Sequence, residues 1–443
     1  MSSLHVAIVG GGITGLVLAI GLRARGVACT IYERAAGFSE IGAGIGISPN
    51  AEAALRIVDP ALHDAYLAAI TPNGEDYFQW IDGYATDKLL YRLHLGQNGF
   101  QGGRRSELLQ AWAALVPTTV VQFRKELVGV TDAAGAPMLL NFADGTTATA
   151  DVVIGCDGVW SRVRTLLFGA AYRATYSHQF CFRAVVPMEA ARAALGAHRA
   201  STRFMYNGPN AHAITYPVAK GAMLNVLVVV ADPNPWQDAE QDSNRGGSLS
   251  SDSAAATRQT TGRGRREEAE EAVTGWQASM RGVVSLLPNK PDRWAIFDMR
   301  DHPVPSYAVG RVALAGDAAH TAGPHLGAGA GFGIEDALVL ATLLKDVNKE
   351  RNEDGAVAVH QRVAAALRAY SSVRYERTQW LVQHTREAVD LFQWRDAAKG
   401  QDPEAFAREI TWRFHHIWHH DAEAMLAQAR TAYMDGINKH GKS

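Results

Sequence analysis

A glycine-rich turn near the start of the chain is the feature that most constrains its fold. A predicted apolar strand over 5–9 leads directly into Gly10–Gly15 (GGGITG), and a helix of small and apolar residues follows over 12–25. A second strand over 29–32 ends at Glu33. A glycine motif alone is weak evidence, but strand, glycines, helix, strand and terminal acid in one stretch are much more specific. The pattern predicts a Rossmann-like βαβ unit in an α/β fold.

The residues of this turn predict a nucleotide site. Gly10 permits the tight turn, Gly12 lets the backbone approach a pyrophosphate, and Gly15 lets helix and strand pack closely. The helix N-terminus presents unpaired N–H groups and the positive end of its dipole to the phosphates. Glu33 lies about 20 residues beyond the first glycine, where an acid accepts hydrogen bonds from ribose hydroxyls. An adenosine without a 2′-phosphate is therefore expected.

Two later turns also follow predicted strands and carry acids. Gly155–Gly158 (GCDG) contains Asp157, where an acid and a neighbouring backbone N–H could touch a cofactor. Asp317, in the segment GDAAH, can accept hydrogen bonds from a ribityl or ribose hydroxyl. Beyond it, Pro324–Gly331 offers small residues and free N–H groups at a helix start. Such a segment can approach a flat ring and stabilise negative charge there.

Composition and charge exclude several classes of protein. With 443 residues, 47% hydrophobic and 20% charged, the chain is typical of a soluble globular protein. Its net charge of −2 gives no electrostatic reason to expect nucleic acid or an anionic membrane as partner, and no apolar run approaches the length of a membrane span. The early first strand leaves no room for a signal peptide, and the three cysteines form no C-x-x-C pair, so a cytoplasmic protein is expected. The histidines between 412 and 420 show no ligand geometry, and no metal site is predicted.

The middle of the chain changes character. A run of strand-like segments predicts a second, antiparallel sheet; they cover 180–186, 202–206, 211–216 and 223–230. The polar stretch 237–264 is predicted to be a surface loop, either a lid or a disordered insertion. From about residue 357 to the end the chain is predicted to be mainly helical.

The three turns in this order resemble those of the flavoprotein aromatic hydroxylases of the para-hydroxybenzoate hydroxylase type. The resemblance covers nearly the whole chain and includes Arg105, which matches a family arginine near the flavin. It implies a Rossmann-like FAD-binding domain with an inserted antiparallel-sheet substrate domain and a helical C-terminal region. The predicted boundaries are 1–175 and 301–350 for the FAD-binding domain, 176–300 for the substrate domain and 351–443 for the helical region.

The resemblance also assigns residues to bound FAD. The first turn, with Glu33 and Arg105, would hold its ADP side, Asp317 the ribityl–pyrophosphate region, and the loop 327–331 the isoalloxazine. Asp157 would have a dual role with FAD and the nicotinamide nucleotide. The predicted cofactor-binding residues are Gly10, Gly12, Gly15, Glu33, Arg34, Gly44, Arg105, Asp157, Asp317, Gly327, Ala328, Gly329 and Ala330.

The same family implies the reaction. NADH or NADPH would dock transiently and reduce the flavin. The sequence contains no second strand-linked fingerprint for this nicotinamide nucleotide. Reduced flavin and O2, the co-substrate, would give a C4a-hydroperoxide that hydroxylates a small phenolic substrate. Because that species decays when water has access, the ring must lie in a closed, dry pocket. Attack is fastest on an electron-rich phenolate, so the protein should stabilise that anion.

Three residues are predicted to be catalytic. Arg183 is a charge within an apolar strand, and Tyr216 ends another strand. Fungal flavoprotein hydroxylases that dearomatise polyketide phenols carry Arg and Tyr at matching positions, where they are proposed to clamp the phenolate. Bacterial salicylate hydroxylases have a similar Arg, with Phe in place of this Tyr. His325, beside the flavin loop, could act as a base or orient the substrate, and a structural histidine that caps the loop is the alternative.

The sequence therefore favours hydroxylation of a polyketide phenol in secondary metabolism, with or without oxidative dearomatisation. Decarboxylating salicylate 1-hydroxylation is the alternative, in which Arg183 would pair with a carboxylate. A flavin-binding electron carrier or redox sensor that oxygenates nothing is a third reading. The substrate, the regiochemistry, the choice of NADH or NADPH, and a monomer or homodimer remain open.

Overall fold

The computed structural model describes residues 4–38, 44–96, 99–132, 136–236, 261–350 and 358–440. The predicted surface loop 237–264 lies outside these residues except for 261–264. Within that remainder, Thr261–Arg263 form the short strand β17.

A six-stranded sheet carries the predicted βαβ unit. Its order is β19-β20-β12-β1-β2-β8, and neighbouring strands are parallel except β19 with β20. The strands are β1 (His5–Val9), β2 (Ala28–Glu33), β8 (Val121–Phe123), β12 (Val152–Gly155), β19 (Ala308–Val309) and β20 (Val312–Leu314). Every residue of β12 is buried, as is usual for a parallel strand covered on both faces. Helix α1 (Ile13–Ala24) packs against α10 (Gly329–Glu350), so the predicted Rossmann-like part is confirmed.

An eight-stranded sheet forms the second main layer. Its order is β17-β18-β13-β16-β15-β14-β5-β6, and all its pairs are antiparallel except β14 with β5. The predicted antiparallel sheet is thus confirmed. Its other strands are β5 (Tyr77–Asp82), β6 (Leu89–His94), β13 (Thr175–Pro187), β14 (Phe204–Gly208), β15 (Ala211–Val218), β16 (Met223–Ala231) and β18 (Asp292–Asp298).

Helices cover the two faces of this sheet differently. One face packs against the short helices α6 (Met188–Ser201), α7 (Arg266–Ala272) and α8 (Ala278–Ser285). The other face carries a cluster of buried aromatic residues that packs against the C-terminal helices. We call this second face the inner face.

Strands β5 and β6 were not among the strands predicted from the sequence. They come from the predicted first part of the FAD-binding domain, yet they extend the sheet of the predicted substrate domain. Phe78 and Trp80 of β5 point to the inner face and are buried there. The domain boundaries given above stay a prediction.

Two smaller sheets complete the β structure. The hairpin predicted around Asp144-Gly145 is present, as β10 (Met138–Phe142) and β11 (Thr147–Ala150), and β9 (Leu127–Thr131) extends it. The other sheet is antiparallel, in the order β3-β7-β4, and its strands are β3 (Gly44–Ile47), β7 (Gln101–Arg104) and β4 (Ile70–Thr71). It supplies residues to the site described below.

Short helices connect these sheets. They are α2 (Pro49–Val58), α3 (Pro60–Ala69), α4 (Arg105–Ala113), α5 (Arg162–Phe168) and α9 (Asp317–His320). Asp59 caps α3 by accepting a hydrogen bond from the Ala61 N–H at 2.7 Å, which satisfies one of the free donors at the helix start.

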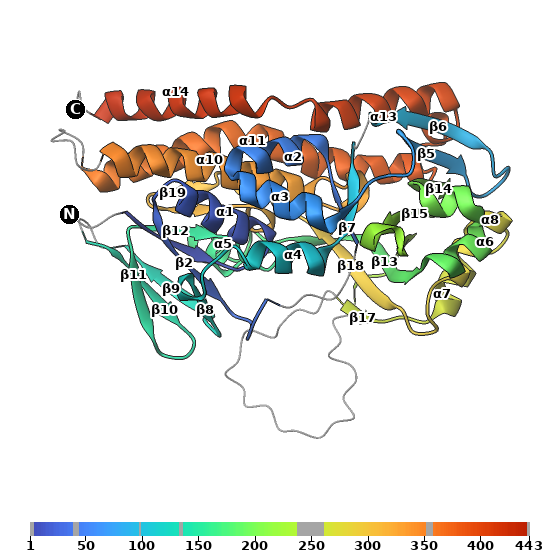
Figure 1. Cartoon of the computed structure of the whole chain (residues 1–443), viewed down its shortest axis with the longest axis horizontal. Helices are drawn as coiled ribbons and strands as arrows, with labels where there is room; N and C mark the ends of the chain where they lie inside the picture. Colours follow the sequence, from blue (N-terminus) through green and yellow to red (C-terminus); the bar gives the residue numbers. More distant parts are fainter. Residues whose placement is uncertain are drawn as a thin grey trace, which may run out of the picture.

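The C-terminal region is helical, as predicted. It contains α11 (Val359–Phe392), α12 (Ala397–Gly400), α13 (Pro403–Trp418) and α14 (Ala422–His440). Figure 1 shows α10, α11, α13 and α14 lying along one side of the molecule, where they run past both main sheets. Among the described helices, none combines the length and apolarity that crossing a membrane requires.

Candidate active site

The first glycine turn has two tight positions and one open position. Gly10 has φ +104°, and a Cβ placed on it would lie 2.4 Å from the carbonyl oxygen of Cys156. A Cβ on Gly15 would lie 2.1 Å from the carbonyl oxygen of Gly10, so helix and strand pack too closely for any side chain there. A Cβ on Gly12 would meet nothing within 4 Å. Open space therefore lies at the N-terminus of α1, where the predicted diphosphate fits.

Glu33 ends β2 beside this turn. Its carboxylate accepts hydrogen bonds from the backbone N–H groups of Gly11 and Ala35, both at 2.7 Å. These bonds fix the turn, and a carboxylate has further lone pairs for ribose hydroxyls. Arg34 next to it is exposed, and Arg105, the first residue of α4, is half-buried.

The three sequence motifs meet at the carboxyl ends of β1, β12 and β20 in the six-stranded sheet. The tight approach of Gly10 to Cys156 joins the first turn to the second. The side chain of Thr14 joins the first turn to the third, because a Cβ on Gly316 would lie 2.4 Å from its Oγ1 and one on Gly333 would lie 2.2 Å from it. The resemblance that places all three motifs on one cofactor is thus matched by their contacts.

The two motif aspartates have different surroundings. Asp157 accepts hydrogen bonds from the Ser161 hydroxyl at 2.6 Å and from the N–H groups of Arg162 and Val163 at 2.7 and 3.0 Å. It therefore holds the start of α5, a role that its sequence context did not predict. Asp317 is exposed at the start of α9, which leaves its carboxylate accessible to a hydroxyl of a bound cofactor.

The predicted flavin loop leads into α10. Gly327 has φ +64°, and a Cβ on it would lie 2.6 Å from the ring of Phe100, so glycine is required there. Ala328 is buried and Ala330 half-buried, whereas a Cβ on Gly329 would meet nothing within 4 Å. Free N–H groups at the start of a long helix thus border open space, as a flat anionic ring requires.

A buried charge cluster lies beneath this loop and was not predicted. Arg374 of α11 is completely buried and pairs with Glu335 at 2.6 Å and with Asp336 at 2.7 Å, both from α10. Asp336 also binds the imidazole of His320 at 2.6 Å and accepts the Gly316 N–H at 2.9 Å. The cluster therefore holds the third motif against α10. An acidic pair inside an apolar helix was the signal in the sequence.

The inner face of the eight-stranded sheet brings Arg183 and Tyr216 together. Arg183 of β13 is paired with Leu227 of β16, and Tyr216 of β15 is paired with Asn225 of β16. Leu227 and Asn225 are two positions apart, so their side chains point to the same side of the sheet. Directly paired residues also share a side. The two predicted clamp residues therefore lie on one face, on the two strands flanking β16.

Tyr216 and Gly44 are direct neighbours. A Cβ on Gly44 would lie 2.7 Å from the Tyr216 hydroxyl, and the Gly44 N–H donates to the Asn225 side-chain oxygen at 2.9 Å. The predicted cofactor-binding glycine thus abuts the inner face. Arg183 is half-buried, and its guanidinium lies 4.8 Å from the ring centroid of Trp294.

His325 also contacts the inner face, beside His212 of β15. Its ring centroid lies 5.4 Å from that of His212, which is four positions before Tyr216 on β15 and so points to the same side of the sheet. His212 was not predicted from the sequence. Burial, and then the charges of Arg395 and Arg386, lower the pKa of His325 to about 3. Burial also lowers the pKa of His212. A neutral imidazole with so low a pKa is a poor base near neutral pH, which favours an orienting role for His325.

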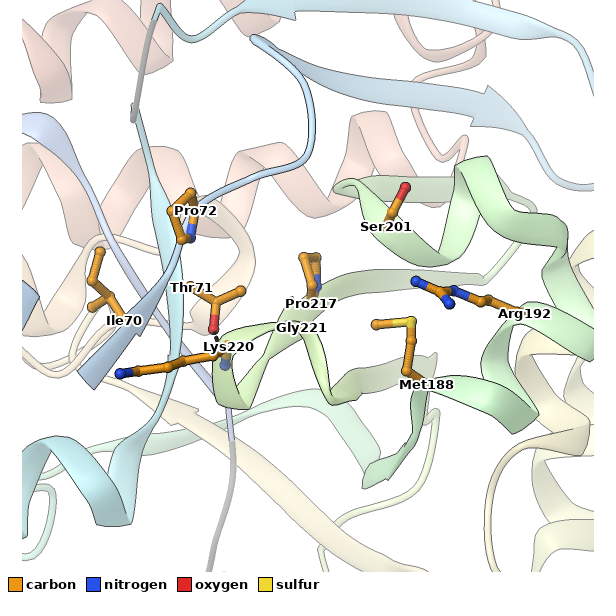
Figure 2. A pocket seen from close by; sticks show the side chains of 9 residues that line it. All are labelled: Ile70, Thr71, Pro72, Met188, Arg192, Ser201, Pro217, Lys220 and Gly221. Carbon is orange, nitrogen blue, oxygen red and sulfur yellow. Dashed lines mark hydrogen bonds between the residues drawn. The ribbon is translucent and has the colours of Figure 1, made fainter. Parts of the chain in front are cut away.

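A separate surface pocket lies beyond the end of β15. It has a volume of about 410 Å³, and Figure 2 shows its lining side chains, including Thr71, which accepts a hydrogen bond from the Lys220 N–H at 2.7 Å. None of the three predicted catalytic residues lines it. Within the described ranges, no group of His, Cys, Asp and Glu is arranged to hold a metal ion.

Comparison with known proteins identifies the family. The family model described as "FAD binding domain" matches residues 3–385. An FAD-dependent monooxygenase of Aspergillus niger is 43% identical over 457 residues, with 99% of each chain covered. A salicylate hydroxylase of Sarocladium schorii is 37% identical, with 99% of this chain and 92% of that protein covered. The solved structure of a salicylate hydroxylase substrate complex is 26% identical, has a TM-score of 0.80, and is matched over 97% of this chain and 98% of its own.

These similarities run nearly end to end and agree with the meeting of the three motifs. The family model covers all three turns and both main sheets. The chain therefore belongs to the FAD binding domain family and is an FAD-dependent monooxygenase.

Proposed function

We propose that the protein hydroxylates the ring of a small phenol of polyketide type, with NADH or NADPH as reductant and O2 as co-substrate. The observation that carries the proposal is the placement of Arg183 and Tyr216 on one sheet face, with Gly44 against the Tyr216 hydroxyl. Similarity to FAD-dependent monooxygenases of fungi supports it, including one from Monascus ruber that is 43% identical. Oxidative dearomatisation of the same ring is part of the proposal.

The cofactor residues fit FAD. Its diphosphate would lie in the open space at Gly12, its ribose near Glu33, and its ring along the loop that ends at Gly329. Bound FAD, once reduced, supplies an activated oxygen atom derived from O2. The remaining predicted contacts, from Arg34, Arg105 and Asp157, are part of the same proposal.

The chain's own residues would prepare the substrate. The Arg183 guanidinium and the Tyr216 hydroxyl would both donate hydrogen bonds to the phenolate oxygen, which favours the electron-rich anion. Apolar side chains of the inner face would exclude water. His325 would orient the substrate as a neutral imidazole.

Decarboxylating salicylate 1-hydroxylation is the second candidate. The salicylate hydroxylases among the similar proteins favour it. In that reaction Arg183 would pair with the substrate carboxylate, and the Tyr216 hydroxyl would still face the phenolic oxygen.

A panel of acylresorcinols and salicylates would separate the two candidates. We expect acylresorcinols to stimulate NAD(P)H oxidation coupled to O2 uptake, with a product heavier by one oxygen atom. Salicylates giving a product that has lost CO2 would support the second candidate. No stimulation by either class would contradict both candidates.

The cellular setting is also proposed. The cysteines Cys29, Cys156 and Cys181 are buried and unpaired, which suits a reducing compartment such as the cytoplasm. A monomer or homodimer stays a prediction.

Replacing Tyr216 by Phe should slow hydroxylation more than flavin reduction. A hydrogen bond to a charged group is worth about 1.5–3 kcal/mol, so a fall of about 10- to 100-fold in the hydroxylation rate is expected. Stopped-flow absorbance separates the two steps in one experiment. Equal losses in both would argue against a role at the phenolate.

Replacing Arg183 by Ala should weaken substrate binding by about 100-fold, because it removes the cation that would pair with the bound phenolate. The FAD content should not change, since Arg183 lies on the other sheet from the glycine turns. Substrate titration and the flavin-to-protein absorbance ratio measure the two effects. A colourless variant would count against the assignment.

A further inference from the structure

Arg203 is a buried cation whose side chain has no polar partner among the residues that the structure describes. It precedes β14 and is only 1% exposed. Within the described ranges, no group accepts a hydrogen bond from its enclosed Nε and Nη1 atoms, and no carboxylate forms an ion pair with its guanidinium. Burying an unpaired charge is costly, so a side chain kept in this state points to a missing negative charge nearby.

Aromatic rings surround this guanidinium. It lies 3.8 Å from the ring centroid of Phe100, 4.7 Å from that of Tyr216 and 5.5 Å from that of Phe78. Cation–π attraction offsets part of the lost hydration. The backbone is also fixed, because the Arg203 N–H donates to the Asn73 side-chain oxygen at 2.8 Å. The charge is therefore held beside the predicted clamp residue.

The contacts of Tyr216 suggest what the charge does. Its ring fits against bare backbone, since a Cβ on Gly102 would lie 2.8 Å from it, and its hydroxyl lies against Gly44. Burial raises the pKa of Tyr216, and the charges of Arg203 and then Arg183 oppose this. Besides Tyr216, Tyr66 of α3 also raises the pKa of Arg203, against the lowering by burial. Burial and then the charge of Glu52 raise the pKa of Tyr66.

We propose that Arg203 is a positioning residue that acts through Tyr216: it holds the ring and makes its hydroxyl a stronger hydrogen-bond donor to a bound phenolate. The inference rests on the proposed function, because it assumes a phenolic substrate at Tyr216. The substrate binds as the anion and its proton passes to solvent, while Tyr216 keeps its own proton and shares it with the phenolate oxygen. The bound anion then supplies the negative charge that Arg203 lacks.

Binding of a phenolate without turnover tests this inference. The probe is 2,4-dihydroxybenzaldehyde, whose phenolate absorbs at longer wavelength than its phenol, added to the oxidised holoenzyme without NAD(P)H over a range of pH. Arg203→Met should weaken phenolate binding about tenfold and move its onset to higher pH. Arg203→Lys, which keeps the charge, should recover most of the affinity. Arg199→Met is the control, since Arg199 lies over the ring of Phe204 rather than that of Tyr216.

A double-mutant cycle shows whether the effect passes through Tyr216. In the Tyr216→Phe background, Arg203→Met should add little further loss. Independent, additive losses, or unchanged binding in Arg203→Met, would overturn the inference. If Arg203→Met does not fold, Arg203→Gln replaces it, and equal losses in the Gln and Lys variants would then be the contrary result.

The same measurements separate this inference from the function on which it rests. A wild-type protein that responds to no phenol would overturn both. Wild-type hydroxylation of phenols, with Arg203 variants that bind the phenolate as the wild type does, would overturn the role of Arg203 alone.

Discussion

A Gly12→Asp variant should purify as a folded but colourless protein. Gly12 is the N-cap of α1, and its Cβ position faces open space, so the new side chain fits without a clash. Aspartate is a favoured N-cap residue and would accept hydrogen bonds from the free N–H groups of the helix. It would also place a negative charge where the FAD diphosphate must lie. We expect FAD affinity to fall by at least about 1,000-fold, equivalent to about 4 kcal/mol.

Gly15→Ala is the matched comparison, because its added methyl group would lie 2.1 Å from the Gly10 carbonyl oxygen. That variant should lose both flavin and thermal stability. Circular dichroism melting and the flavin-to-protein absorbance ratio measure the two properties separately. A Gly12→Asp protein that retains stoichiometric FAD would falsify the placement of the diphosphate at this helix.

Arg374→Met should destabilise the protein by about 3–5 kcal/mol, because it leaves buried carboxylates without their common partner. Arg374 is the link between Glu335 and Asp336, and all three side chains are buried. The control is Arg430→Met, which removes an exposed ion pair with Asp346 and should cost less than about 1 kcal/mol. Denaturant unfolding of the two variants measures the difference. Similar small losses in both would contradict the importance of the cluster.

The effect of Arg374→Met should depend on pH. Burial alone would raise the pKa of Glu335 and of Asp336. The charges of Arg374 and Arg377 outweigh burial and lower the pKa of Glu335, and those of His320 and Arg374 do the same for Asp336. Carboxyls with lowered folded-state pKa values contribute stability that is present above their unfolded values and is lost as the pH falls. The stability gap between wild type and variant should therefore narrow in acid.

The sequence predicted those parts of the site that depend on local patterns. The first turn, the strand before Asp157 and the apolar strand around Arg183 each carry a short-range signal of glycines, alternation or burial. All three were found in the predicted elements. The inner face was predicted only in part. The strands that became β13, β14, β15 and β16 were recognised, but β5 and β6, which extend the same sheet, were not.

The features that escaped prediction depend on contacts between distant segments. Arg203 lies near the start of the predicted strand 202–206, and only the packing of Phe100 and Tyr216 around it shows that its charge is buried. The place of His212 beside the site depends on its contact with His325, which lies more than a hundred positions later in the sequence. The segments of β5 and β6 were not recognised as strands, and β5 joins β14 by a parallel pairing that no short-range pattern specifies.

The origin of β5 and β6 has a consequence for recombining members of this family. Exchanging residues 176–300 alone would leave β14 of the donor beside β5 of the recipient, with mismatched side chains at their shared border. A chimera designed to alter substrate choice should carry 77–94 together with the middle segment. Two separate crossover blocks, rather than one, are the natural unit of exchange.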